Sequence, residues 1–462
     1  MPSDWSFVGI KLSSLLHLPV ARSCNFSAVS HHAGICQFGL FKSRIPTRFI
    51  STSSLPFVSS SFKLDRTQKF SDPIGGSSGL STPAKAVDRN KELEVAVRTV
   101  HIACSLCQNV QKSIQLKNGN HAQQKDDNSP VTVADWSVQA IVSWLLSETL
   151  GSENVSILAE EDTKTLSSPD AVGLLEAVVK TVNDCLLEAP RFGFAAPREP
   201  LGTSQVLETI SRCNASGGSI GRFWTLDPVD GTLGFLRGDQ YAVGLALIED
   251  GKVLLGVLGC PNYPMRKEWL SGHHRSNGIA SDPTPSESME KGCVFYAMKG
   301  SGKAWMQPLL RENNTLFWPN HATPVRVSSI KNPVLATLCE PVETSNSNHS
   351  FTVGLAQSVG LRNRPMRVYS MVKYAAIARG DAEIFMKFPR ADYKEKIWDH
   401  APGIVIIEEA GGLVTDAGGK PLNFSKGIFL EDLDRGIVAC SAAKLHEAII
   451  KAVDASWNSS SL

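Results

Sequence analysis

One nine-residue segment in the middle of the chain constrains its fold and chemistry more than any other. Residues 224–232 read Trp-Thr-Leu-Asp-Pro-Val-Asp-Gly-Thr, so Asp227 and Asp230 flank a proline. Proline fixes its own φ and removes a backbone donor, which favours a tight turn. In such a turn Asp227 can bridge two cations and Asp230 can bind one, with the Val229 carbonyl as a further oxygen ligand. The alternative is an ordinary Asp-Pro turn whose aspartate accepts local hydrogen bonds.

Gly231 and Thr232, which follow directly, predict contact with phosphate. Where a chain turns into a helix, its free N–H groups can bind phosphate oxygens, and the Thr232 hydroxyl can join a water-activating pair. Magnesium prefers oxygen ligands, and two such ions can stabilise both the attacking and the leaving oxygen of an in-line displacement. The segment therefore predicts metal-assisted hydrolysis of a phosphate ester, with further carboxylates supplied from elsewhere in the chain.

Glu160 and Glu161 are the first of these further carboxylates. They follow residues 155–159, an apolar run that predicts a short buried strand. Neighbouring residues on a strand point in opposite directions, so we expect only one of the two glutamates to be a ligand. The alternative is a solvated acidic loop.

Two aspartates stand where helices are expected to begin. Asp399 opens a predicted helix over 399–410, where an N-cap role is the alternative to metal binding, and His400 beside it is interpreted as a structural histidine. Asp135 enters a predicted helix over 132–150, where it is either a polar-face residue or the group that orients a threonine hydroxyl.

The pattern of apolar residues predicts a mixture of helices and strands. Helices are expected over 92–116, 132–150, 169–188, 368–379 (which includes Ser370 and Lys373) and 399–410. Residues 241–248 and 252–260 are β-rich, and Asp250-Gly251 between them predicts a hairpin turn. This mixture favours a layered α+β protein over a doubly wound parallel sheet.

Composition bounds the class of protein. The chain has 462 residues, 42% of them hydrophobic and 20% charged, with a net charge of +1. That balance argues against nucleic acid or an acidic membrane surface as a partner, and no run is apolar enough to span a bilayer. The ten cysteines are scattered, which favours a reducing compartment. Cys104 and Cys107 lie on the apolar stripe of the first helix, so core packing is preferred to a redox or metal motif.

The N-terminal region differs from the rest of the chain. From Met1 to Leu64 the only acidic residue is Asp4, while basic residues recur among many serines. Such composition is typical of organelle transit peptides, so residues 1–64 are predicted to be a disordered transit peptide, with a plain disordered tail as the alternative. Several arginines favour the mitochondrion over the chloroplast. Residues 65–86 predict a linker, and the folded part is divided into 87–330 and 331–462.

The order of the acidic motifs points to one family. Ala-Glu-Glu-Asp at 159–162, the segment 224–232, Trp-Asp-His-Ala at 398–401 and Glu-Glu-Ala-Gly-Gly at 408–412 together resemble the lithium-sensitive, magnesium-dependent phosphatase superfamily, from about residue 88 to the C-terminus. That superfamily includes inositol monophosphatases, fructose-1,6-bisphosphatases and 3'(2'),5'-bisphosphate nucleotidases. The chain is most similar to the plant and yeast nucleotidases, on residues 227–243, 255–262 and 395–400.

The resemblance implies a layered α-β-α-β-α sandwich of the inositol monophosphatase and fructose-1,6-bisphosphatase type, holding about two to three Mg²⁺ ions. It implies that a metal-activated water hydrolyses the 3'-phosphate of adenosine 3',5'-bisphosphate to give AMP and phosphate, with the sulfated relative PAPS and inositol 1,4-bisphosphate as secondary substrates. The protein is expected to be a monomer. The implied metal ligands are Glu160, Asp227, Val229 (through its carbonyl), Asp230 and Asp399; the implied water-activating pair is Asp135 and Thr232; the implied substrate-binding residues are Thr232, His349, Ser370, Lys373, Lys387 and Asp399.

The chain departs from the family pattern around the nucleotide. The family often has Ser-His-Asp where this chain has Asn348-His-Ser350, an aspartate where it has Tyr369, and an arginine where it has Lys387. These changes bear on substrate preference and leave the metal set intact. Two alternatives stay open: an inositol (poly)phosphate 1-phosphatase, and a non-catalytic nucleotide-binding sensor on the same fold.

Overall fold

The computed structural model describes residues 88–117, 123–124, 130–267, 290–311, 314–319, 322–342, 347–391 and 393–459. All of them fall within one compact unit, Pro83–Leu462. The predicted transit peptide and linker lie outside the described residues, as does most of the polar loop expected between the first two helices. Among the described residues, every helix is too short or too polar to cross a membrane.

Helices account for much of this unit. The α-helices are α1 (Arg89–Lys117), α2 (Val133–Leu150), α3 (Val172–Leu187), α4 (Thr203–Ser211), α5 (Thr232–Arg237), α7 (His349–Val359), α8 (Val372–Arg379), α9 (Ala401–Glu409) and α10 (Ala443–Ser459). Short 3-10 turns are η1 (Ser152–Asn154), η2 (Pro169–Ala171), η3 (Ala189–Phe192), η4 (Pro333–Leu335) and η5 (Ile397–Asp399).

The strands form two large sheets and one short ribbon. A seven-stranded sheet has the order β3 (Ile157–Ala159), β4 (Arg222–Asp230), β5 (Ala242–Glu249), β6 (Lys252–Pro264), β7 (Lys291–Met298), β8 (Ala304–Pro308) and β9 (Thr323–Val325). A five-stranded sheet has the order β11 (Met366–Val368), β10 (Leu338–Pro341), β12 (Ile384–Lys387), β14 (Ile437–Cys440) and β13 (Leu413–Asp416). The ribbon pairs β1 (Gln123–Gln124) with β2 (Pro130–Val131).

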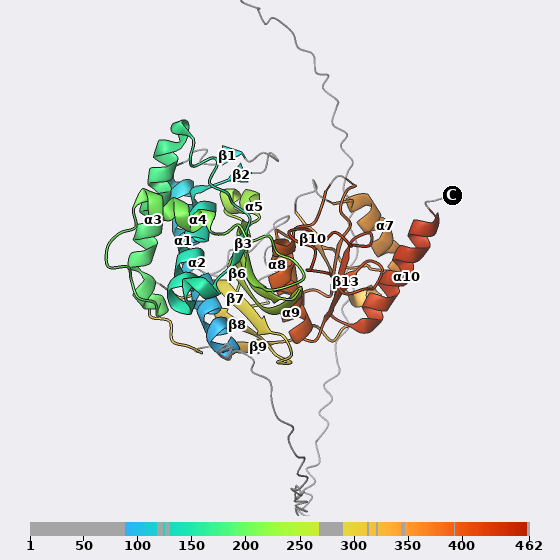
Figure 1. Ribbon diagram of the computed structural model, residues 1–462. Helices are drawn as coiled ribbons and strands as arrows, with labels where there is room; N and C mark the ends of the chain where they lie inside the picture. The colour runs from blue at the N-terminus through green and yellow to red at the C-terminus, as the bar shows by residue number, and fades with distance from the viewer. Residues whose placement is uncertain are drawn as a thin grey trace, which may run out of the picture. The chain divides into compact units, whose positions relative to one another are not determined.

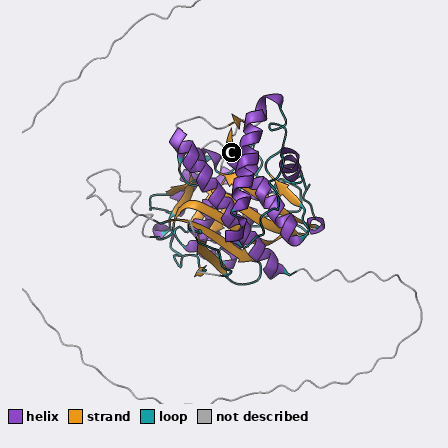
Figure 2. Ribbon diagram, turned by 90° about the vertical axis from the view of Figure 1, so that its left-hand side faces the viewer, coloured by secondary structure: helices purple, strands orange, loops and turns teal. Residues whose placement is uncertain are grey.

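Helices and sheets alternate in five layers (Figure 1). Helix α1 packs on β5, β6 and β7, while α9 contacts β5 and β6 from the other side of the same sheet. Helices α8 and α9 also contact the five-stranded sheet, through β10, β12 and β13, and α10 packs on β14 and α7. Figure 2 shows the helices crossing in front of the sheet. The predicted layered α-β-α-β-α sandwich is therefore confirmed.

Strand β5 shows why both faces of the large sheet are covered. Successive side chains on a strand point to opposite faces. Val243, Leu245 and Leu247 join the core under α1 and α2, whereas Ala242 and Ala246 join the core against α8 and α9. An unbroken apolar run of this kind is buried on both sides, so each sheet face needs a layer of helices.

Most elements expected from the sequence are present. The first three predicted helices are confirmed as α1, α2 and α3. The predicted hairpin is confirmed as β5 and β6, and Asp250 and Gly251 have φ values of 49° and 71°, as a turn matched to strand twist requires. Core packing of Cys104 and Cys107 is also confirmed, because both thiols are free and buried in the core around α1.

Two predicted helices begin later than expected. Residues Met366–Val368 form β11, and Ser370 has a φ of 57°, in the left-handed region, so α8 begins only at Val372. Asp399 ends the 3-10 turn η5, and the residue at the N-cap of α9 is His400, without a side-chain cap bond.

The predicted boundary at 330/331 falls between the two sheets and stays a prediction, since both sheets belong to one compact unit.

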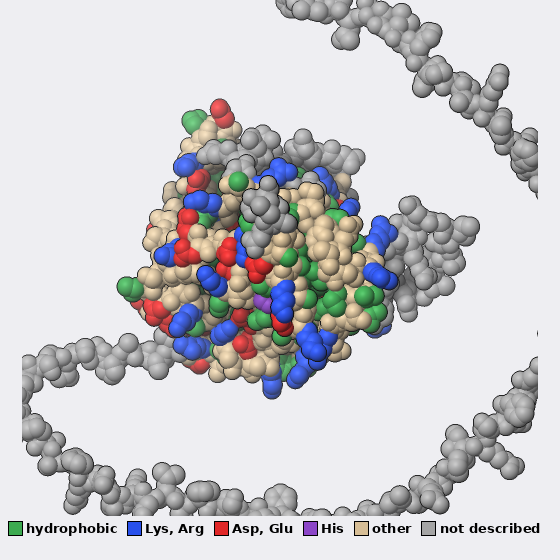
Figure 3. Space-filling view, turned by 90° about the vertical axis from the view of Figure 1, so that its right-hand side faces the viewer, with side chains coloured by type: hydrophobic (Ala, Val, Ile, Leu, Met, Phe, Trp, Pro, Cys, Tyr) green, Lys and Arg blue, Asp and Glu red, His purple; other side chains and the backbone are tan. Residues whose placement is uncertain are grey.

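Acidic and basic side chains are interspersed on the face of the molecule drawn in Figure 3. This face carries no extended field of one sign, in keeping with the net charge of +1.

We predict that Gly256→Val destabilises the fold, because helix α9 approaches β6 too closely for a side chain. A Cβ at Gly256 would lie 2.5 Å from the Pro402 carbonyl oxygen and 2.6 Å from Val405 Cγ1. Overpacking of this kind costs about 1–3 kcal/mol, measurable as a lower free energy of unfolding in urea. Gly173→Ala is the control, since nothing lies within 4 Å of the added methyl group. Equal stability of Gly256→Val and the wild type would contradict the close approach.

Candidate functional site

The segment that carries Asp227 and Asp230 lies at the end of β4. Its pairing with β5 shifts register between Asp227, opposite Gly244, and Asp230, opposite Ala242. The predicted tight turn is therefore wrong. The segment forms a β-bulge, which places an extra residue in the strand and redirects its side chains. Pro228 fits this position because it has no N–H to donate to the ladder.

Strand pairing brings Glu160 beside this segment. Strand β3 runs parallel to β4, with Ala159 opposite Leu226. Glu160 and Asp227 are the next residues on the two strands, and paired strands lie about 4.8 Å apart. The 3-10 turn η5, which ends in Asp399, contacts both β4 and β5. Acidic residues from three separate stretches of the chain are thus brought to one end of the sheet.

The electrostatics of these carboxyl groups show that they share one environment. Burial and the nearby Asp399 carboxylate together raise the pKa of Asp230 to about 7, against the lowering effects of Lys373 and of the Met371 N–H. Burial also raises the pKa of Asp399, where Glu160 acts in the same direction against the lowering effects of His400 and Lys387. Asp227 is 2% exposed. Gathering several carboxylates with little exposure to water is unfavourable unless positive charge joins them.

The donor set fits a hard divalent cation. Glu160, Asp227, Asp230 and Asp399 offer only oxygen atoms, which is the ligand type that Mg²⁺ and similar ions select. The Val229 carbonyl already accepts a hydrogen bond from Thr232 Oγ1 at 3.2 Å. Since a carbonyl oxygen has two lone pairs, it retains the capacity to bind a second partner.

The start of α5 is shaped for close contact with the segment before α8. Gly231 has a φ of 89°, which favours glycine, and a Cβ there would lie 2.9 Å from Ser370 Cβ. Met371 donates its backbone N–H to Asp230 Oδ2 at 2.5 Å. These contacts place Ser370 directly against Gly231, and Thr232 begins the helix beside it.

Three lysines supply positive charge around the carboxylates. Burial lowers the pKa of Lys373 to about 8 although Asp230 acts to raise it, and its ammonium donates to the Ser370 carbonyl at 2.5 Å. Lys396 Nζ lies 3.3 Å from Glu160 Oε1. Lys387 donates to Glu395. The structure therefore brings Ser370, Lys373 and Lys387 to the acidic residues, and their contact with a substrate stays a prediction.

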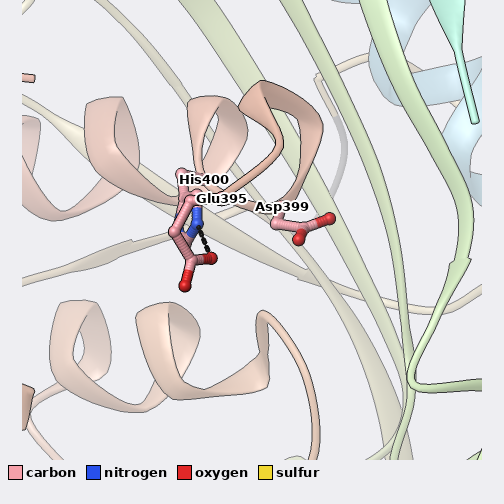
Figure 4. A group of neighbouring side chains, drawn as sticks. All are labelled: Glu395, Asp399 and His400. Carbon is pink, nitrogen blue, oxygen red and sulfur yellow. Dashed lines mark hydrogen bonds and ion pairs between the residues drawn. The ribbon is translucent and has the colours of Figure 1, made fainter. Parts of the chain in front are cut away.

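Glu395, Asp399 and His400 form a compact group (Figure 4) whose candidate ligand atoms lie within 4.8 Å of one another. Glu395 and His400 point toward each other in Figure 4, while Asp399 is directed away from them. His400 Nε2 lies 2.9 Å from Glu395 Oε2 and His400 Nδ1 lies 2.7 Å from the Tyr374 hydroxyl. Both ring nitrogens are thus engaged by protein groups, which confirms the interpretation of His400 as a structural histidine.

Asp135 and His349 lie in different surroundings. Asp135 Oδ2 accepts from the Thr132 hydroxyl at 2.7 Å and from the Thr132 N–H at 2.8 Å, completing a capping box at the start of α2. Its role in activating water together with Thr232 stays a prediction. His349 begins α7 and lines a cavity of about 800 Å³ with Arg390 and Trp457, among others. Contact between His349 and a nucleotide also stays a prediction.

Glu395 and Lys396 are site residues to which the sequence analysis assigns no role. Both directly precede the Trp-Asp motif at 398–399. Their position next to a motif is a signal, but no local pattern shows that Glu395 is 2% exposed or that Lys396 reaches Glu160 from a distant stretch.

The comparison with protein families decides the classification. A model described as "Inositol monophosphatase family" matches residues 88–458. The chain belongs to the inositol monophosphatase family. Members of this family are metal-dependent, typically using Mg²⁺, which agrees with the four carboxylates gathered at one end of the large sheet. The matched region begins at residue 88, which is also the first residue that the structure describes.

Individual relatives within the inositol monophosphatase family carry a narrower name. The chain is 63% identical over 371 residues to "3',5'-bisphosphate nucleotidase AHL" of Arabidopsis thaliana, covering 80% of this chain and 98% of the relative. It is 42% identical over 363 residues to "3'(2'),5'-bisphosphate nucleotidase" of Oryza sativa, covering 78% and 93%. A solved structure of extragenic suppressor protein suhB from Bartonella henselae covers 78% of this chain and 98% of its own, with 18% identity and a TM-score of 0.47.

We predict that Thr132→Ala and Asp135→Asn each lower the free energy of unfolding by about 1 kcal/mol, because each breaks the capping box of α2. Urea unfolding of the full chain measures the loss, with Ser211→Ala near the end of α4 as an exposed control. Unchanged stability in both variants would contradict the capping role. Steady-state kinetics of the same proteins test the second role: Asp135→Asn lowers kcat by about 100-fold relative to Thr132→Ala if Asp135 also activates water.

Proposed function

We propose that this protein is a magnesium-dependent 3'(2'),5'-bisphosphate nucleotidase, which hydrolyses the 3'-phosphate of adenosine 3',5'-bisphosphate to AMP and phosphate. The observation that carries the proposal is the convergence of Glu160, Asp227, Asp230 and Asp399 at one end of the large sheet. The names of relatives that align over most of their length support the choice of substrate. PAPS is proposed as a secondary substrate.

The four acidic residues and the Val229 carbonyl would hold about two to three Mg²⁺ ions. When bound, magnesium would supply positive charge that makes water more acidic and offsets the charge of the phosphate. Asp227, on the bulge, is buried between Glu160 on one side and Asp230 on the other. It is therefore placed to bind one cation together with Glu160 and another together with Asp230.

The chain's own groups would bind and orient the substrate. Thr232 and the first amides of α5 would bind the phosphate, and Ser370 lies against Gly231 at the start of this helix. Lys373 is 7% exposed and lies close enough to Asp230 for the two charges to affect each other. A buried ammonium beside the carboxylates would attract a phosphate dianion and balance its charge once the acids are engaged by cations. His349 is proposed to contact the nucleotide.

We predict that Asp227→Asn abolishes release of phosphate from adenosine 3',5'-bisphosphate, because it removes the buried anionic ligand that lies next to both Glu160 and Asp230. Phosphate release by the purified full chain, with Mg²⁺ present and after its removal by a chelator, measures the effect. Asp162→Asn is the matched control, since the exposed side chain of this aspartate in the Glu-Glu-Asp stretch contacts only Lys164 among the contacts described. Wild-type turnover in Asp227→Asn would refute the assigned metal site, whereas a wild-type protein that binds the nucleotide without releasing phosphate would be a non-catalytic nucleotide sensor.

We predict that turnover depends on the adenosine moiety. Adenosine 3',5'-bisphosphate and PAPS should be hydrolysed, while inositol 1,4-bisphosphate and fructose bisphosphate should have lower kcat/KM, with added lithium reducing all activity. A panel of these substrates under identical Mg²⁺ concentrations measures the preference. Higher kcat/KM for the inositol phosphate would identify an inositol (poly)phosphate 1-phosphatase instead.

We also propose that residues 1–64 direct the protein to the mitochondrion, with the chloroplast as the alternative. The family match begins only at residue 88, which leaves this acid-poor segment outside the enzyme. A fluorescent protein fused to residues 1–86 should accumulate in one of the two organelles, and diffuse fluorescence would contradict a targeting role.

A further inference from the structure

A continuous network of hydrogen-bonded side chains includes His400, the residue that follows Asp399. The Tyr374 hydroxyl, on α8, is 2.7 Å from His400 Nδ1. His400 Nε2 is 2.9 Å from Glu395 Oε2, and the same oxygen accepts from Lys387 Nζ, at the end of β12, at 2.6 Å. This network therefore connects β12, the loop before η5, the start of α9 and α8.

Three members of this network are almost completely shielded from water, while the Lys387 side chain is 17% exposed. Glu395 and His400 are each 2% exposed and Tyr374 is 1% exposed. Burial acts to raise the pKa of Glu395, but Lys387 and His400 together lower it to about 2. A buried ion pair contributes little net stability because both charges lose water, whereas removing one partner leaves an uncompensated charge. The arrangement fixes geometry strongly even where it adds little to stability.

Two contacts hold the Lys387 ammonium in this network. Its ammonium donates to Glu395 Oε2 and lies 5.1 Å from the centre of the Tyr393 ring. Glu395 Oε1 has no hydrogen-bond partner among the described residues, so Oε2 carries both contacts of this carboxylate. Loss of Lys387 would leave the buried carboxylate with His400 as its one described donor.

We propose that Lys387 and Glu395 are positioning residues, which hold Asp399 in place through His400, and that Lys387 does not bind the substrate. The inference rests on the proposed function in that Asp399 is taken as a metal ligand. His400 directly follows Asp399, so the hydrogen bonds on its ring fix the peptide that joins them. The two side chains diverge from that peptide, with His400 directed toward Glu395 and Asp399 directed away from both (Figure 4).

Small displacements of Asp399 would have large effects. Magnesium requires near-octahedral ligands at about 2.0–2.1 Å, and partners that orient its ligands change metal affinity by about 10–100-fold. A lysine that acts through Asp399 therefore affects cation binding before substrate is present. A lysine that touches substrate would instead affect the KM.

The test measures cation binding and kinetics in the same variants of the full chain. We expect Lys387→Ala and Glu395→Gln to raise the Kd for Mg²⁺, measured by calorimetry without substrate, by about tenfold or more. At saturating Mg²⁺ the KM for adenosine 3',5'-bisphosphate should stay within about twofold of wild type while kcat falls. Lys387→Arg should restore both values, because it keeps a donor and a positive charge.

The outcome that overturns the inference is a KM for adenosine 3',5'-bisphosphate raised by about tenfold or more in Lys387→Ala with an unchanged Kd for Mg²⁺. Lys394→Ala is the control, since this lysine of the same loop pairs with Glu431 and is 63% exposed. Should Lys387→Ala fail to fold, Lys387→Gln takes its place, with urea unfolding as the check. If the wild type binds Mg²⁺ but does not hydrolyse the nucleotide, the proposed function fails and the calorimetry still decides the positioning role.

Discussion

Mutual repulsion between carboxylates that are buried or half-buried is the constraint on which the organisation of this protein depends. Glu160, Asp227, Asp230 and Asp399 come from three separate stretches of the chain and meet at one end of the large sheet. The pKa values of Asp230 and Asp399 are raised by burial and by neighbouring acids. A fold that gathers like charges in this way needs positive charge at the same place. The requirement links the architecture of the inositol monophosphatase family to metal-dependent chemistry.

The surrounding structure keeps these acids together by contacts that cross the layers. Asp230 accepts the Met371 N–H, which joins the end of β4 to the segment before α8. Glycine at 231 allows Ser370 to approach the start of α5. Behind Asp399, the buried pair of Glu395 and His400 joins α9 to β12 and α8. The acidic site is therefore held by the middle helical layer as much as by the sheet that carries its ligands.

Sequence reasoning succeeded where the signal is periodic. The long helices α1, α2 and α3 bury an apolar stripe, and the β5–β6 hairpin has two apolar runs around Asp250-Gly251, so local pattern and tertiary structure agree. The acidic motifs drew attention to Glu160, Asp227, Asp230 and Asp399, which the structure brings to one end of the sheet. Their convergence could not be derived from spacing, since the pairing of β3 with β4 joins residues more than sixty positions apart.

The failures have local physical causes. Asp-Pro usually suggests a turn, but pairing with β5 extends the strand through Pro228 and accommodates it as a bulge. Ser370 was placed inside a helix because its neighbours are apolar at helical spacing, whereas contact with Gly231 accompanies a positive φ there. The sequence around Glu395 carries no local signal of burial, and only the folded structure shows its burial with Lys387 and His400.

The most direct measurement is a crystal structure of the protein soaked in Mn²⁺, with anomalous scattering used to locate the ions. Mn²⁺ selects the same oxygen ligands as Mg²⁺ and gives an anomalous signal of its own. Anomalous peaks bounded by the side chains of Glu160, Asp227, Asp230 and Asp399 are expected. Peaks confined to Glu395 and His400, or no ordered ion among the four carboxylates, would contradict a shared cation site.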